Sequence, residues 1–234
     1  MKKVLILGAS SNIGYSLTKK YLNKNFFVYA HYNQNAGKLR KFKKKNLKIF
    51  NFDLKKITNF EKFVQKSEIF KNLDIFVSLT GYLNLKKIEK SKVKDFFDHI
   101  NVNYLSNFIV TKKIVNSMKK KGGGKILYAS SIGTKFGGSH NSFIYSLSKF
   151  MNEFFPRPYR NLTKNKILIN TLKIGLTDTK LNKKDKKKDM KKRISLIPLS
   201  RMAKIEEVVN YIEFLTSEKN TLIANETINI SGGE

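Results

Sequence analysis

Cysteine and tryptophan are absent from this chain of 234 residues, and only three prolines and three histidines occur in it. A chain without cysteine can form neither a disulfide nor a metal site with cysteine ligands. His31, His99 and His140 are scattered along the sequence and show no spacing typical of metal ligands. We therefore predict no metal site.

Long apolar runs are also missing. No stretch approaches the roughly 20 apolar residues that a membrane span requires. Met1, Lys2 and Lys3 are followed by a short apolar run that ends at Gly8, which is unlike a secretory signal. These features predict a soluble, cytoplasmic protein without a membrane partner.

Acidic residues are scarce: the chain has 17 of them against 47 lysines and arginines, which gives a formal net charge of +30. Such a charge is compatible with an acidic partner, for example a nucleic acid, an anionic membrane or an acidic substrate carrier. Lysine and asparagine are frequent throughout the sequence, however, and this favours a general compositional bias. Nucleic-acid binding would need basic and aromatic residues gathered on one face, so we predict no specific nucleic-acid partner.

Predicted strands and helices alternate along the chain. Short apolar runs predict strands over residues 4–7, 26–32, 47–52, 73–79, 125–129, 167–172 and 227–230. Helical spacing of apolar residues predicts helices over 13–22, 93–118, 142–155 and 206–216. Without a repeat or a linker, this rhythm predicts a single α/β domain over residues 1–234. We expect a Rossmann-type, doubly wound parallel sheet of about seven strands with helices on both faces.

A glycine-rich turn follows the first predicted strand, with the sequence Gly8-Ala-Ser-Ser-Asn-Ile-Gly14. This turn is where a doubly wound fold binds a pyrophosphate, because backbone N–H groups at the helix N-terminus face the anion and glycines let it approach. Ser10 and Ser11 can add hydroxyl donors, and Asn12 is the non-glycine residue that best tolerates a left-handed backbone. A plain tight turn is the alternative at this position.

The end of the second predicted strand bears on the choice of cofactor. An acidic residue there binds the ribose 2′-hydroxyl of NAD and repels the 2′-phosphate of NADP. The chain has His-Tyr-Asn-Gln at 31–34, followed by Lys38 and Arg40, and no acidic residue. NADP is therefore favoured over NAD. Asp53, at the end of the third strand, is predicted either to accept a hydrogen bond from adenine or to cap the strand.

Tyr145 and Lys149 lie one helical turn apart in the predicted helix over 142–155. Reduction of a carbonyl needs a proton donor beside the oxygen, and a tyrosine hydroxyl has an unperturbed pKa of about 10. A lysine ammonium nearby stabilises the phenolate and lowers that pKa. Ser130 and Ser131 end the fifth strand and supply hydroxyls that can hold a carbonyl oxygen. With the glycine turn, these residues predict hydride transfer between a nicotinamide and a carbonyl; without it, Tyr145 and Lys149 would be an ordinary amphipathic pair.

Together these motifs resemble the short-chain dehydrogenase/reductase family, in its classical type and in particular its 3-oxoacyl-acyl-carrier-protein reductases. The glycine turn is similar to the family's Thr-Gly-x-x-x-Gly-x-Gly, and Tyr145-Ser-Leu-Ser-Lys149 is similar to its Tyr-x-x-x-Lys. Asn103 lies where the family has a catalytic Asn, and Ser131 lies where it has a catalytic Ser, one residue further from the Tyr than is most usual. Segments within 169–179 and 197–233 resemble the family's nicotinamide-contacting and C-terminal segments, so the resemblance covers nearly the whole chain.

The resemblance implies a role for each of these residues. Tyr145 would be the general acid in reduction, and Lys149 would lower its pKa and bind the nicotinamide ribose. Ser131 would orient the substrate carbonyl, and Asn103 would hold a water in a proton relay from Lys149. The cofactor-binding residues expected from the turn, the strand ends and the resemblance are Gly8, Ser10, Ser11, Asn12, Ile13, Gly14, Tyr32, Asn33, Asp53, Leu54, Thr80, Gly81, Tyr145, Lys149, Gly175, Thr177 and Thr179.

The sequence departs from the family pattern at several positions. Leu7 replaces a Thr, Asn12 replaces the second glycine of the turn, and Ile174 replaces the Pro before Gly175. Ser-Leu-Thr-Gly at 78–81 replaces Asn-Asn-Ala-Gly, which removes amides that would stabilise the central strand. These departures indicate a divergent, specialised member of the family.

Two prolines fall within the helix that the family pattern assigns to Tyr145 and Lys149. Proline in a helix interior costs about 3 kcal/mol, because it removes a hydrogen bond and clashes with the preceding turn. Pro156 and Pro158 therefore predict that this helix ends or kinks near Phe155.

A basic run over residues 182–193 follows Thr179, where the family's mobile substrate lid begins. The resemblance thus implies a substrate lid over 176–200. A cationic lid favours an anionic substrate, such as an acyl chain on acidic acyl carrier protein, a nucleotide-linked sugar or a sugar acid. A solvated loop without this role is the alternative.

These expectations combine into an NADP(H)-dependent oxidoreductase that reduces a small or carrier-bound anionic carbonyl substrate to an alcohol, or runs the reverse reaction. The resemblance also implies a homo-oligomer, a tetramer or dimer, built through the long helices and the C-terminal strand. The alternative is a non-catalytic, dinucleotide-binding regulator that has kept the fold. The altered glycine turn and strand-end motifs favour the regulator, whereas the intact Asn103, Ser131, Tyr145 and Lys149 favour the enzyme.

Overall fold

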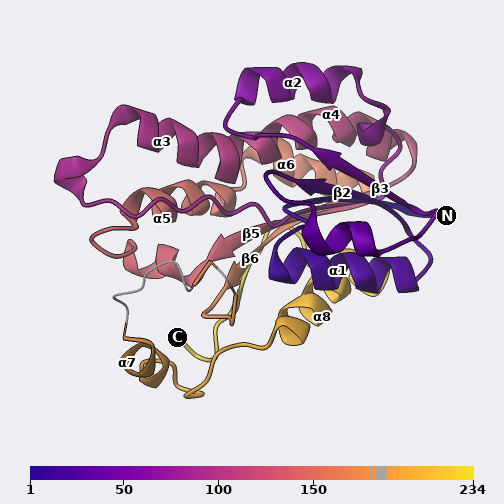
Figure 1. The fold of residues 1–234 in the computed structure, drawn as a ribbon. Helices are drawn as coiled ribbons and strands as arrows, with labels where there is room; N and C mark the ends of the chain where they lie inside the picture. Colours follow the sequence, from indigo (N-terminus) through magenta and orange to yellow (C-terminus); the bar gives the residue numbers. More distant parts are fainter. Residues whose placement is uncertain (180, 183–188) are drawn as a thin grey trace.

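The computed structural model describes residues 1–179, 181–182 and 189–234. Their strands form one parallel sheet in the order β3-β2-β1-β4-β5-β6-β7, with helices on both faces (Figure 1). The chain order reverses between β1 and β4, as in a doubly wound fold, and the predicted fold class is thereby confirmed. The strands are β1 (Lys3–Leu7), β2 (Phe27–Tyr32), β3 (Leu47–Asn51), β4 (Ile75–Ser78), β5 (Gly124–Ser131), β6 (Ile167–Ile174) and β7 (Thr227–Ile230).

The helices that pack around the sheet are α1 (Asn12–Asn23), α2 (Ile57–Lys66), α3 (Val93–Ile100), α4 (Ser106–Lys120), α5 (Phe143–Phe150), α6 (Arg157–Asn161), α7 (Met190–Ser195) and α8 (Ile205–Thr216). The short helices α6 and α7 were not predicted, and neither was α2. The spacing of Ile57, Phe60 and Val64 is helical, and Phe60 and Val64 are buried in the core. Within the described residues, no helix is both long and apolar enough to cross a membrane.

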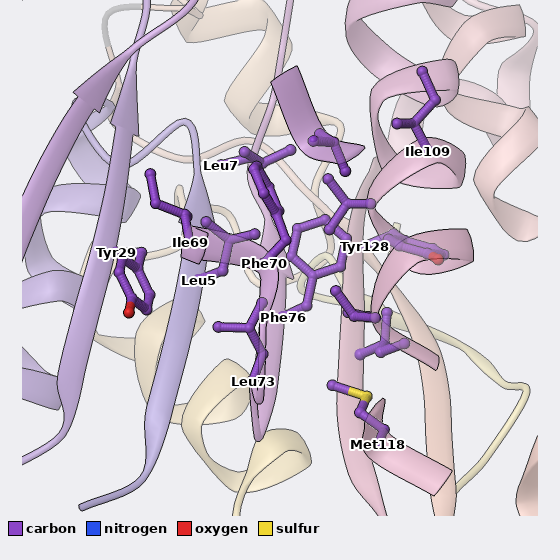
Figure 2. Close-up of a cluster of buried hydrophobic side chains, with 14 of the residues drawn as sticks. Leu5, Leu7, Tyr29, Ile69, Phe70, Leu73, Phe76, Ile109, Met118 and Tyr128 are labelled. Carbon is purple, nitrogen blue, oxygen red and sulfur yellow. The ribbon is translucent and has the colours of Figure 1, made fainter. Parts of the chain in front are cut away.

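The strands bury side chains on both faces of the sheet. Leu5, Leu7 and Phe76 belong to the cluster between the sheet and helices α2 and α4 (Figure 2). Ile6 and Val77 belong to the cluster on the opposite face, which α1 and α8 cover. Burial on both faces explains why these strands are continuous apolar runs. The paired strands β1, β4 and β5 bring their carboxyl ends together at one edge of the sheet.

The predicted helix over 93–118 is divided in the structure. A wider π turn over Asn101–Leu105 separates α3 from α4, a feature that is frequent at functional sites. The backbone carbonyl of Asn103 accepts hydrogen bonds from the side-chain amides of Asn107 and Asn152, at 3.1 and 2.9 Å. The predicted helical stretch is thus confirmed, but the π turn within it was not predicted, because these contacts come from side chains, one of them 49 residues away along the chain.

The helix that carries Tyr145 and Lys149 ends early. Helix α5 stops at Phe150, a 3₁₀ turn covers Met151–Glu153, and Phe154 is extended. Pro156 then caps α6, and Pro158 lies in the first turn of α6, where proline costs little. The predicted break near Phe155 is confirmed.

His31, on β2, forms hydrogen bonds with the residues that follow β1 and β3, close to the glycine turn. Its ring is buried, and Nδ1 accepts a hydrogen bond of 3.2 Å from the backbone N–H of Gly8. Because Nδ1 is an acceptor, the ring proton is on Nε2, which lies 2.9 Å from the carbonyl oxygen of Phe52 and donates to it. Burial lowers the pKa of His31 to about 4, so the ring is neutral near pH 7. No local sequence pattern predicted this role for His31.

We predict that His31 makes stability fall as the pH decreases from about 6.5 to 4. The pKa of His31 is about 4 in the folded protein, below the value of about 6.5 for an unfolded chain, so the unfolded state binds more protons within this window. Wild-type protein should lose about 2 kcal/mol of unfolding free energy between pH 7 and pH 5, measured by urea titration with circular dichroism.

The matched variant is His31→Gln, which cannot take up a proton in this range. Its stability should depend less on pH, with the remaining dependence due to His99, whose pKa is also lowered by burial. Equal pH dependence in wild type and variant would contradict the assignment to His31.

Candidate active site

The carboxyl ends of β5 and β6 and helix α5 border a cavity of about 610 Å³. Ser131, at the end of β5, and Tyr145, on α5, both line it. Much of the remaining wall is apolar, with Leu83, Phe136 and Leu176 among its side chains. Doubly wound folds bind their ligands at this edge of the sheet, outside the carboxyl ends of the strands.

Lys149 is buried beneath this cavity. Its Nζ donates hydrogen bonds of 2.6 Å to the backbone carbonyl oxygens of Thr80 and Ala129, which lie at the ends of β4 and β5. These bonds use two of its three N–H donors. Burial lowers the pKa of Lys149 to about 7, because the charged amine has lost its hydration.

Tyr145 and Ser131 lie close together in the wall of this cavity. Two effects act on the phenol of Tyr145: burial raises its pKa, and the nearby side chain of Ser131 lowers it. The larger effect is burial, which raises the pKa of Tyr145 to about 12. The Lys149 amine hydrogen-bonds to two backbone carbonyls. The pKa of Tyr145 is therefore set mainly by burial and, to a smaller extent, by Ser131.

Asn103 is buried and braces the segment that follows β4. Its Oδ1 accepts from the backbone N–H of Tyr82 at 2.8 Å, and its Nδ2 donates to the Tyr82 carbonyl at 3.0 Å. Nδ2 also lies 2.9 Å from the hydroxyl of Ser148, the residue before Lys149. Asn103 thus joins the π turn, the end of β4 and helix α5.

Hydroxyl groups replace the amides that the family pattern has at the end of β4. The side chains of Ser78 and Thr80 are 3.1 Å apart, within hydrogen-bond distance, and both residues are buried. The carbonyl of Thr80 accepts from Lys149, and Asn103 holds the backbone of Tyr82. The strand end is therefore held without the missing amides.

The glycine turn between β1 and α1 is closely packed. A Cβ atom on Gly14 would lie 2.4 Å from the carbonyl oxygen of Gly8, and one on Gly8 would lie 2.8 Å from that of Leu79. Ser11 is the N-cap of α1, and its Oγ accepts from the Gly14 N–H at 3.0 Å. Asn12 is the first residue of the helix and is not left-handed, so that expectation was wrong: with Ser11 as cap, Asn12 already has a helical backbone.

The end of β2 borders a second hollow, of about 380 Å³, lined by Tyr32, Gln34, Asn35, Ala36, Gly37 and Arg40. Helix α1 supports the segment after β2, because the ring of Tyr15 stacks on Phe42 at 4.7 Å. Lys38 lies 5.8 Å from the centre of the Tyr15 ring. Lys38 thus lies near the first turns of α1, and Arg40 lies in the wall of the hollow at the end of β2.

Asp53 has the contacts of a strand-end cap. Its Oδ1 accepts from the backbone N–H of Lys55 at 3.1 Å, and its carbonyl accepts from Lys56 at 3.0 Å. The structure therefore supports the capping alternative, and Leu54 beside it is buried.

The last predicted site residues follow β6. A Cβ atom on Gly175 would lie 2.6 Å from the Cα of Ser231, so this position requires glycine. The Thr177 hydroxyl donates to the Gly175 carbonyl at 3.1 Å, and the Thr179 hydroxyl lies 3.5 Å from Nδ2 of Asn182.

Half of the basic run over 182–193 lies outside the described residues, which lack 183–188. Of its last residues, Arg193 lines the cavity and forms an ion pair with Glu234. This pairing was not predicted, because it joins residues that are distant in the sequence.

Residues 2–190 match the family described as short chain dehydrogenase. Over 238 residues, the chain is 29% identical to the 3-oxoacyl-[acyl-carrier-protein] reductase FabG of Buchnera aphidicola subsp. Schizaphis graminum, a match that covers 99% of this chain and 96% of that protein. It is 30% identical over 174 residues to the enzyme of the same name from Thermotoga maritima, with 74% and 69% of the two chains covered.

The fold is similar to solved structures of the same architecture. The structure of ElxO with NADP bound has a TM-score of 0.85 and 23% sequence identity, and the match covers 99% of this chain and 98% of that one. A structure described as a short chain dehydrogenase/reductase family protein also has a TM-score of 0.85, at 18% identity and with 99% and 96% of the chains covered. With the family match over most of its length and the Rossmann-like sheet, this protein belongs to the short-chain dehydrogenase/reductase family of oxidoreductases.

Proposed function

We propose that this protein is an NADP(H)-dependent reductase that converts a carbonyl to an alcohol, or catalyses the reverse reaction. The observation that carries the proposal is the contact between Ser131 and Tyr145 in the wall of the large cavity, with Lys149 buried one helical turn away. This is the constellation that general acid catalysis at a carbonyl oxygen requires.

The chain's own residues suit a dinucleotide. The close approach of Gly8 and Gly14 leaves no room for side chains, and the N-terminus of α1 presents backbone N–H groups that attract a pyrophosphate. When bound, the cofactor supplies the hydride. The residues proposed to hold it are Gly8, Ser10, Ser11, Asn12, Ile13, Gly14, Tyr32, Asn33, Asp53, Leu54, Thr80, Gly81, Tyr145, Lys149, Gly175, Thr177 and Thr179.

In reduction, Tyr145 transfers its hydroxyl proton to the substrate carbonyl oxygen. Ser131, which lines the same cavity wall as Tyr145, donates to the same oxygen and orients it. Lys149 has one N–H donor left for the cofactor ribose, and its cationic form stabilises the phenolate that remains on Tyr145. We propose that Asn103 holds a water in the proton relay that runs from Lys149 and restores the proton of Tyr145.

NADP is proposed over NAD because of the residues around the end of β2. No acidic residue occurs at 31–34, and Arg40 lines the hollow there, with Lys38 nearby. A guanidinium group is suited to bind the 2′-phosphate of NADP in a bidentate manner.

A 3-oxoacyl group on a carrier is the substrate that we favour, with an anionic sugar derivative as the other candidate. The relatives named 3-oxoacyl-[acyl-carrier-protein] reductase and the largely apolar wall of the cavity support the acyl group. In this proposal residues 1–234 act as one catalytic domain, and 176–200 form the substrate lid. The alternative, a non-catalytic regulator, is disfavoured by the contact between Tyr145 and Ser131 beside the buried Lys149.

We further propose that the protein acts in the cytoplasm as a homotetramer or homodimer. Helices α3 and α5 lie side by side (Figure 1), and together with α4 and the segment after α5 they carry large apolar side chains that are between 41% and 70% exposed. Such apolar surfaces mark interaction sites in many proteins. The exposed residues are Phe97, Phe108, Leu147, Phe150 and Phe154.

Tyr145→Phe should lower kcat for a 3-oxoacyl thioester by about 100- to 10,000-fold, because it removes the proton donor. The affinity for NADPH, followed by nucleotide fluorescence, should change by less than about twofold, since the variant keeps the aromatic ring beside the cofactor and loses only the hydroxyl that acts in the reaction step. Tyr211→Phe, on α8, is the control. A Tyr145→Phe variant with wild-type kcat would contradict the proposed role.

Arg40→Ala should weaken NADPH binding roughly 10- to 100-fold, the loss expected for a charge-assisted hydrogen bond. NADH lacks the 2′-phosphate, so its affinity should stay within about twofold. Arg157→Ala removes an exposed arginine from α6 and serves as control. If Arg40→Ala weakens both nucleotides equally, the 2′-phosphate is not its ligand.

Phe150→Glu should shift the protein from a tetramer or dimer toward the monomer, because it places a charge in the proposed interface. Size-exclusion chromatography with light scattering measures this directly. A wild-type protein that is monomeric at micromolar concentration would rule out the proposed assembly.

A further inference from the structure

Glu153 lies one helical turn beyond Lys149, at the end of the 3₁₀ turn that follows α5. Its side chain is 8% exposed, and its carboxylate reaches groups from β5, from the turn after β5 and from β6. None of the catalytic roles proposed above uses this residue, although a carboxylate so deeply buried needs partners for its charge.

The carboxylate of Glu153 has three close partners. Its Oε1 accepts from the hydroxyls of Ser130 and Thr134, at 2.6 and 2.7 Å. Its Oε2 is 2.9 Å from Nζ of Lys173, whose side chain is 13% exposed. Both oxygens are therefore satisfied, and the negative charge is balanced by a cation that is itself largely buried.

These partners surround the proposed catalytic Ser131. Ser130 precedes it on β5, and the Thr134 hydroxyl also lies 2.9 Å from the Ser131 carbonyl oxygen. The Ser130 hydroxyl is 3.3 Å from the backbone carbonyl of Lys149 as well. The carboxylate of Glu153 thus adds a connection between the strand end that carries Ser131 and the turn that follows helix α5, beside the direct contacts that Lys149 makes with Ser130 and Ala129.

Stability alone does not account for this arrangement. Burying an ion pair costs desolvation energy that its attraction often only balances, and an apolar pair of similar size serves stability equally well. Precise placement of the catalytic groups would explain the buried carboxylate, because a displacement of about 1 Å in a catalytic group can lower the reaction rate on the order of 100-fold.

We propose that Glu153 is a positioning residue: with Lys173 as its counterion, it holds the segment 130–134 against α5 and so sets the position of Ser131 relative to Tyr145. This inference rests on the proposed function for the effect on catalysis, but the contact between the segment and the helix does not depend on it.

The first test measures the kinetics of Glu153→Ala with a 3-oxoacyl thioester and NADPH. We expect kcat to fall about 10- to 100-fold, with the KM for NADPH within about twofold of wild type. The control is Asp74→Ala, which removes the acidic partner of Lys121 at the opposite end of β4 and should leave kcat unchanged. A Glu153→Ala variant with the kcat of the control would overturn the proposal.

A rescue variant separates positioning from stability. Glu153→Gln combined with Lys173→Met removes both charges and leaves an amide oxygen that can accept from Ser130 and Thr134. This double variant should recover kcat to within about fivefold of wild type. If kcat stays as low as in Glu153→Ala, or if kcat and cofactor affinity fall together, Glu153 has only a general structural role.

Hydrogen exchange keeps the test independent of the proposed function. Backbone amides of residues 131–137 should exchange faster in Glu153→Ala than in wild type, whereas those of β1 and α1 should be unchanged. Unchanged exchange over 131–137 would overturn the inference, whether or not the wild type reduces a carbonyl. Should Glu153→Ala fail to fold, Thr134→Val removes one hydroxyl without changing the volume greatly, and the same outcomes apply to it.

Discussion

The amine of Lys149 is buried between helix α5 and the sheet, and backbone carbonyls from the ends of β4 and β5 accept its hydrogen bonds. A buried ammonium is costly without a counter-charge, and two carbonyl dipoles compensate for only part of that cost. The pKa of Lys149 is therefore lowered to about 7. The protonation of an amine with such a pKa changes readily when a ligand brings a charge near it. Contacts elsewhere in the site hold the segments around this amine in place.

That arrangement requires the strand ends to be rigid. Asn103 holds the backbone of Tyr82 beyond β4, and Glu153 joins the end of β5 to the helix that carries Lys149. On the far side of β4, the glycine turn packs against Leu79 and is anchored by His31 from β2. Polar contacts of Asn103, Glu153 and His31, which come from three separate segments, thus hold an edge whose usual stabilising amides are missing from this chain.

Much of this fold and part of this site could be predicted from local sequence. Strands buried on both faces appear as apolar runs, and Tyr145 and Lys149 reveal their shared helix face through their spacing. Helix α2 was missed because its apolar positions at Ile57, Phe60 and Val64 make a pattern of little more than two turns. The division of the long helix, the tautomer of His31 and the pairing of Glu153 with other segments depend on tertiary contacts, and no local pattern encodes them.

The most direct test of this account is the pH dependence of NADPH binding between about pH 6 and 9, in wild type and in Lys149→Met. An anionic cofactor favours the protonated amine, so its affinity should weaken as the pH rises above about 7, by up to roughly tenfold per pH unit until the pKa of the complex is reached. The variant should bind more weakly and with little pH dependence. Tight, pH-independent binding in both proteins would show that the buried amine does not contact the cofactor, and would contradict the account.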